Sequence, residues 1–80
     1  MGELENLRRK VDSIDSQIIS LLKKRLSLAI KILKAKKKKK MKVYQPDREK
    51  KILQKVTPKL RPIFKEIIRQ TRKLQAKRWK

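Results

Sequence analysis

The chain lacks cysteine and histidine altogether, and its single glycine is Gly2. Without cysteine it can form no disulfide bond and no Cys-ligated zinc site, and without histidine it lacks the commonest general base and metal ligand. Acidic residues are also scarce, since only Asp47, Glu49 and Glu66 follow residue 22. Metal sites or glycoside hydrolysis based on carboxylate clusters are therefore not expected, nor is ordinary nucleophilic catalysis.

Long apolar runs are missing too. The longest run is three residues, at positions 28–30, whereas a helix that crosses a bilayer needs about 20. The first residues also lack the basic and apolar regions of a secretory signal. We therefore expect a soluble cytoplasmic protein of one small domain, residues 1–80, with no membrane association.

Positive charge is what the chain has in excess. Its 27 Lys and Arg residues outnumber seven Asp and Glu, which gives a formal net charge of +20. Residues 1–22 hold three basic and four acidic side chains, whereas residues 23–80 hold 24 basic and three acidic ones. Such a field favours an anionic partner, which could be nucleic acid, an acidic lipid surface or an anionic small molecule.

The apolar pattern of the first half predicts one long helix. No proline or glycine lies between Glu3 and Gln45, and a seam with spacings of three and four residues comprises Leu4, Leu7, Val11, Ile14, Ile18, Leu21, Arg25, Leu28, Ile32 and Ala35. A helix of about 35 residues is about 50 Å long, which exceeds the span of an 80-residue globule. We expect it to pair with the same helix of a second chain.

The lysine run at 36–41 should leave the helix, because like charges one turn apart repel, and residues 37–40 are predicted to form a solvated loop.

Proline marks two further helices. Pro46 with Asp47 is typical of a helix start, and Arg61 with Pro62 marks another after a turn at Thr57. The second helix is short, and the third carries the stripe Ile63, Phe64, Ile67, Ile68, Thr71, Leu74 and Gln75. The fold class is therefore all-α, with a long, a short and a medium helix.

Polar residues interrupt the buried face of every predicted helix. Arg25 occupies the seam of the first helix, and Lys36 lies 11 residues on, on nearly the same face. The second helix places Glu49 inward, and the third places Thr71 and Gln75 one turn apart. Each alone is readily explained as a surface residue. Together they suit a small ligand that has more than one carboxylate and a hydroxyl.

These residues resemble the all-α class of chorismate mutase. The resemblance covers about residues 4–76 and rests on LRRKVDSID at 7–15, LLKKR at 21–25, KAK at 34–36, VYQPDRE at 43–49, and the run from IF at 63–64 to Thr71 and Gln75. It implies an intertwined homodimer in which the long helices of two chains pair. It also implies an isomerase of aromatic amino-acid biosynthesis, which converts chorismate to prephenate by a Claisen rearrangement without a cofactor.

The resemblance also implies a role for each polar position. Arg25, and Arg8 from the other subunit, would bind the two carboxylates. Lys36 and Gln75 would donate to the ether oxygen, and Glu49 would accept from the ring hydroxyl. Arg48 and Thr71 match supporting positions at the substrate. Gln45 stands at a substrate-binding position where the family often has an acid. Its neutral side chain offers no charged acceptor to the substrate hydroxyl. A lyase that acts on isochorismate shares the fold, and Glu49 favours the mutase.

Two other functions fit parts of the sequence. A basic helical protein that binds nucleic acid without enzymatic activity would use the lysine run and the net charge. However, aromatic residues make up only 4% of the chain, and it has no helix-turn-helix, zinc-finger or bZIP signature. A purely structural coiled coil leaves Arg25, Glu49, Thr71 and Gln75 unexplained.

Overall fold

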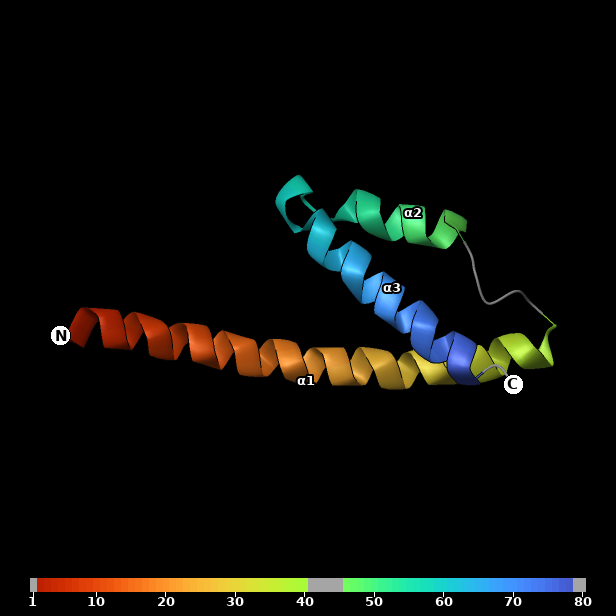
Figure 1. The fold of residues 1–80 in the computed structure, drawn as a ribbon, viewed down its shortest axis with the longest axis horizontal. Helices are drawn as coiled ribbons and strands as arrows, with labels where there is room; N and C mark the ends of the chain where they lie inside the picture. The colour runs from red at the N-terminus through yellow and green to blue at the C-terminus, as the bar shows by residue number, and fades with distance from the viewer. Residues whose placement is uncertain (1, 41–45, 79–80) are drawn as a thin grey trace.

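Three α-helices and one short 3₁₀ helix make up the described part of the chain. The computed structural model describes residues 2–40 and 46–78, and these contain α1 (Gly2–Lys38), α2 (Pro46–Lys55), η1 (Pro58–Leu60) and α3 (Arg61–Arg78) (Figure 1). No strand occurs within these two ranges. The predicted all-α class, with a long, a short and a medium helix, is confirmed.

Helix α1 is longer at its C-terminal end than the sequence suggested. It continues through Lys38 and ends in a turn in which Lys40 has a φ of 57°. The amide of Lys39 donates to the carbonyl of Ala35 at 3.2 Å, and that of Lys40 to Lys37 at 3.1 Å. The prediction that the chain leaves the helix at Lys36 and forms a loop at Lys37 and Lys38 is therefore wrong. Met41, the last residue of that run, lies outside the described residues. Cations in a last turn are attracted by the exposed carbonyls and the negative end of the helix dipole, which opposes their mutual repulsion.

The start of α2 and the junction between α2 and α3 follow the sequence closely. Pro46 is the first residue of α2, and Asp47 and Glu49 lie in its first turn, where acidic side chains are favoured. At the junction, the Nε of Arg61 donates to the carbonyl of Leu53 at 3.2 Å and to that of Val56 at 3.1 Å. The first residue of α3 thus satisfies backbone acceptors at the end of α2.

The α2–α3 hairpin lies against the C-terminal half of α1 only. In Figure 1, α3 crosses α1 near the end of the long helix, and the N-terminal half of α1 extends alone away from the hairpin. The long axis of the molecule is 57 Å. The buried core is correspondingly small and consists of Ala29, Leu33 and Ile68, together with the amide side chain of Gln75.

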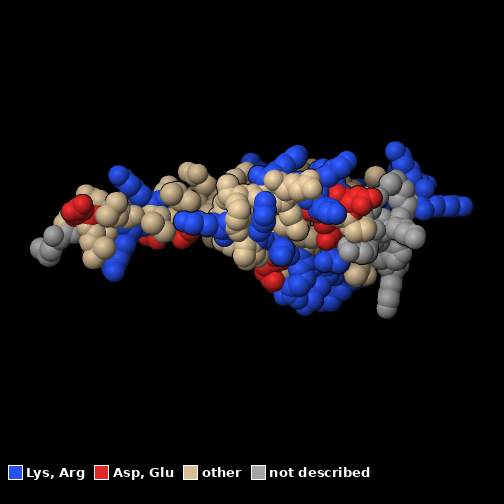
Figure 2. Space-filling model, turned by 90° about the horizontal axis from the view of Figure 1, so that it is seen from above, with Lys and Arg blue, Asp and Glu red and all other residues tan. Residues whose placement is uncertain are grey.

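The apolar seam of α1 remains largely open in the single chain. Nine large apolar side chains in or beside the seam have exposed fractions of 47–62%: Leu4, Leu7, Val11, Ile14, Ile18, Ile19, Leu21, Leu28 and Ile32. We call these nine residues the α1 stripe. Viewed from above, the N-terminal half of α1 carries many uncharged side chains, whereas Lys and Arg gather over the hairpin (Figure 2). Pairing through this stripe stays a prediction.

None of the described helices has the length and apolarity required to cross a membrane.

Candidate active site

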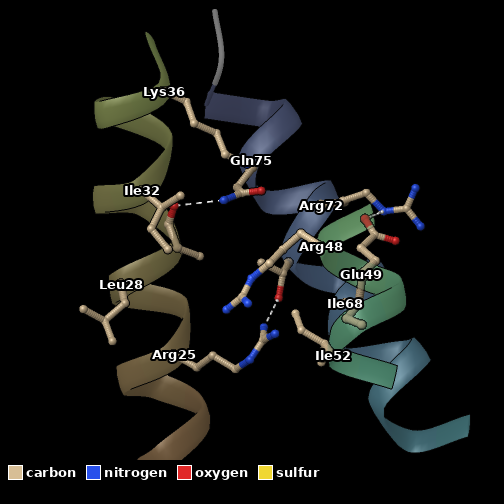
Figure 3. Close-up of a pocket in the computed structure, with 12 residues that line it drawn as sticks. Arg25, Leu28, Ile32, Lys36, Arg48, Glu49, Ile52, Ile68, Arg72 and Gln75 are labelled. Atoms are coloured by element: carbon tan, nitrogen blue, oxygen red, sulfur yellow. Dashed lines mark hydrogen bonds and ion pairs between the residues drawn. The ribbon is translucent and has the colours of Figure 1, made fainter. Parts of the chain in front are cut away.

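A cavity of about 330 Å³ opens between the C-terminal half of α1 and the α2–α3 hairpin (Figure 3). Helix α1 lines one wall, α2 the opposite wall, and α3 the floor between them. The lining combines apolar side chains with five charged ones and two neutral hydrogen-bonding groups: Arg25, Leu28, Ala29, Ile32, Lys36, Arg48, Glu49, Ile52, Ile68, Thr71, Arg72 and Gln75.

The α1 wall brings Arg25 and Lys36 into the same cavity. Its lining residues recur every three or four positions and so occupy one face of the helix. Both cations are half-buried. The side chain of Lys36 runs toward Gln75 in Figure 3, while Arg25 reaches the cavity about three turns below it. The predicted shared face of these two residues is therefore observed.

The guanidinium of Arg25 is held by α3. Its Nη1 donates to the hydroxyl oxygen of Thr71 at 2.9 Å, and that hydroxyl in turn donates to the carbonyl of Ile67 at 2.7 Å. Thr71 uses its hydroxyl both as acceptor and as donor. Arg25 is thereby oriented before any ligand arrives, with other N–H groups of its planar fork remaining to bind one.

Gln75 is the most deeply buried polar residue of the site. It is 6% exposed, and its Nε2 donates to the carbonyl of Ala29 on α1 at 2.9 Å. An amide nitrogen carries two hydrogens, so this bond fixes the side chain and leaves a second N–H for a ligand. The contact also ties α3 to α1 beside the buried core.

Helix α2 contributes two residues of opposite charge. Arg48 extends its guanidinium into the space between α1 and α3, whereas the carboxylate of Glu49 lies nearer to α3 (Figure 3). There the Oε2 of Glu49 forms an ion pair with the Nε of Arg72 at 3.2 Å.

Arg72 is the charged lining residue that the sequence analysis missed. It follows the buried Ile68 by four residues, so helical periodicity places both on one face. That spacing was the available signal, but it was hidden among the basic residues that surround it in the sequence.

One predicted position, Arg8, is not among the residues that line this cavity. Arg8 is exposed on the N-terminal half of α1 and lies 17 residues, or about 25 Å along the helix, from Arg25. It therefore cannot serve the pocket of its own chain, as expected from the sequence. Gln45 lies outside the described residues.

The assembled site is suited to an anion. The lining holds four cations and one carboxylate, that of Glu49, among aliphatic side chains. The cations are Arg25, Lys36, Arg48 and Arg72. Within residues 2–40 and 46–78, no group of three or more His, Cys, Asp or Glu could hold a metal ion. Its chemical capacity is to fix a polyanionic ligand and to stabilise developing negative charge.

Comparison with known proteins points to one family. Residues 7–76 match the family described as chorismate mutase type II. The chain is also 39% identical, over 56 residues, to a bifunctional chorismate mutase/prephenate dehydratase of Aquifex aeolicus (strain VF5). That match covers 70% of this chain and 16% of the relative, so the chain spans about a sixth of the relative's length.

No solved structure gives a significant match. The family match favours the mutase over the nucleic-acid-binding alternative, for which the comparisons offer no support. The resemblance inferred from the sequence is confirmed: the chain belongs to the chorismate mutase type II family.

Proposed function

We propose that this chain binds chorismate and catalyses its rearrangement to prephenate, as an isomerase that needs no cofactor. The observation that carries the proposal is the convergence of Arg25, Lys36, Glu49 and Gln75 on one cavity, in a chain that belongs to a family of this name. The activity would belong to phenylalanine and tyrosine biosynthesis, in the cytoplasm.

Binding of the substrate carboxylates is assigned to the guanidinium groups. Arg25, which Thr71 orients through a 2.9 Å bond, is assigned the first carboxylate, and Arg48 supports it from α2 (Figure 3). Guanidinium binds carboxylate through two parallel hydrogen bonds. Holding the dianion in this way selects the conformer whose side chain folds over the ring, and this orientation lowers the barrier of an intramolecular reaction.

Stabilisation of the transition state is assigned to Lys36 and Gln75. As the C–O bond breaks, negative charge builds on the ether oxygen, and donors aimed at that oxygen bind the transition state more strongly than the substrate. A 10⁶-fold acceleration requires only about 8 kcal/mol. Charge-assisted hydrogen bonds in a partly buried cavity can supply this without a nucleophile or a general base. Glu49 is assigned the ring hydroxyl, from which its carboxylate accepts.

The complete site requires a second copy of the chain. The α1 stripe leaves nine large apolar side chains about half exposed, and seven of them do not line the cavity. Burying these seven against a partner helix would contribute about 1 kcal/mol each. Two antiparallel α1 helices would also bring Arg8 of one chain toward the pocket of the other. We therefore assign Arg8 to the second substrate carboxylate across an intertwined homodimer interface.

The proposal is tested by steady-state turnover of chorismate. Arg25→Ala should lower kcat/KM by at least 10²-fold, since it removes a preorganised charged donor. Lys24→Ala is the matched control, because Lys24 is an exposed neighbour on the same helix and loses the same charge. Retention of full activity by Arg25→Ala, or equal losses in both variants, contradicts the assignment.

A further inference from the structure

An ion pair between Arg72 and Glu49 joins α3 to α2 at the wall of the cavity. The Nε of Arg72 lies 3.2 Å from the Oε2 of Glu49. The Glu49 side chain is 21% exposed and that of Arg72 is 43% exposed. The pair is thus open to solvent mainly on the Arg72 side, while the carboxylate borders the cavity.

The Glu49 carboxylate has rival partners inside the cavity. Arg48 precedes it on α2 and extends its guanidinium into the cavity, which Arg25 also lines (Figure 3). A carboxylate on a flexible side chain pairs readily with a guanidinium in a partly desolvated space. Such pairing would neutralise the charge that an anionic substrate needs, and it would remove Glu49 from the place where a hydroxyl can reach it.

Arg72 holds the carboxylate from the opposite direction. In Figure 3 its guanidinium lies beyond Glu49, on the side away from Arg25 and Arg48. We propose that Arg72 is a positioning residue, which keeps the Glu49 carboxylate on the α2–α3 wall, available to the substrate hydroxyl and apart from the guanidinium groups of the cavity. This inference rests on the proposed function and adds to it a residue that acts through Glu49.

The exposure of Arg72 separates this role from a structural one. An ion pair with an open partner contributes little to folding, because solvent screens the attraction. Removal of Arg72 should therefore leave the thermal melting curve nearly unchanged and should weaken the productive binding of chorismate. Arg72 thus favours substrate binding by placing the Glu49 carboxylate, rather than by stabilising the α2–α3 hairpin.

The test is a double-mutant cycle with Arg72→Gln and Glu49→Gln. In the wild-type background, Arg72→Gln should raise the KM for chorismate about 10-fold, the scale of one charge-assisted interaction, with a much smaller change in kcat. In the Glu49→Gln background the same change should alter kcat/KM by less than about twofold, because no charged carboxylate remains to be positioned. Arg72→Lys should recover part of the loss, since it restores the charge but not the planar fork.

Arg69→Gln is the matched control, because it removes an exposed ion pair with Glu66 one turn earlier on α3 and should leave both kinetic constants unchanged. Equal losses from Arg72→Gln in both backgrounds would overturn the proposal, as would a normal KM in Arg72→Gln.

A crystal structure of Arg72→Gln supplies a readout independent of turnover. We expect the Glu49 carboxylate to contact Arg48 or Arg25, and a carboxylate that stays on the wall contradicts the proposal. Absence of turnover in the wild-type protein would instead count against the proposed function.

Discussion

The separation of Arg8 from Arg25 leads to a prediction about mixed dimers. The two residues are about 25 Å apart along α1, and Arg8 is not among the residues that line the cavity of its own chain. If each site combines Arg25 of one chain with Arg8 of the other, Arg8→Ala and Arg25→Ala should each abolish most activity. A dimer with one variant chain of each kind should nevertheless contain one intact site.

The size of the recovery follows from counting. Random assembly of the two variants gives heterodimers in about half of all dimers, and each has one of its two sites intact, so activity should return to about a quarter of the wild-type value. The assay is chorismate turnover by protein co-expressed from both variants. Arg25→Ala mixed with Lys36→Ala is the control, because both residues belong to the same chain's cavity and no heterodimer would contain an intact site. Recovery in the control, or none in the Arg8 mixture, refutes the shared site.

Three further predictions concern single side chains. Leu33→Ala should lower the free energy of unfolding in urea by about 2–5 kcal/mol, since Leu33 is 2% exposed. Gln75→Leu should reduce kcat at least 10²-fold while circular dichroism stays unchanged, because the proposed donor to the ether oxygen is lost but the buried volume is kept. Hydrogen bonds from Arg69 and then Gln70 lower the pKa of Glu66 from 4.5 to about 2. The small contribution of ionised Glu66 to stability should be complete above pH 4.5 and lost as the pH falls through 2. NMR titration of Glu66 should show a midpoint of about 2, and Arg69→Gln should raise that midpoint.

Much of the fold could be predicted because its signals are local. Pro46 with Asp47 and Arg61 with Pro62 mark helix starts through backbone geometry that depends on adjacent residues alone. The shared face of Arg25 and Lys36 follows from helical periodicity. The end of α1 was missed at Lys37 and Lys38, because repulsion between exposed lysines is worth only a few tenths of a kcal/mol and is opposed by the helix dipole.

The site was less predictable where it depends on contacts between helices. Nothing local indicates that Gln75 donates to the Ala29 carbonyl, or that Arg72 pairs with Glu49, because each bond joins two elements whose orientation is set by packing. The position of Arg8 depends on a further chain, so its role stays a prediction.

The most direct test of the central claim follows both compounds in one sample. Purified protein is mixed with chorismate in the presence of a metal chelator, and proton NMR spectra are recorded over time. The account predicts that prephenate appears in step with the loss of chorismate, much faster than in the matched Arg25→Ala sample. Chorismate that decays no faster than in buffer, or that gives a product other than prephenate, would contradict it.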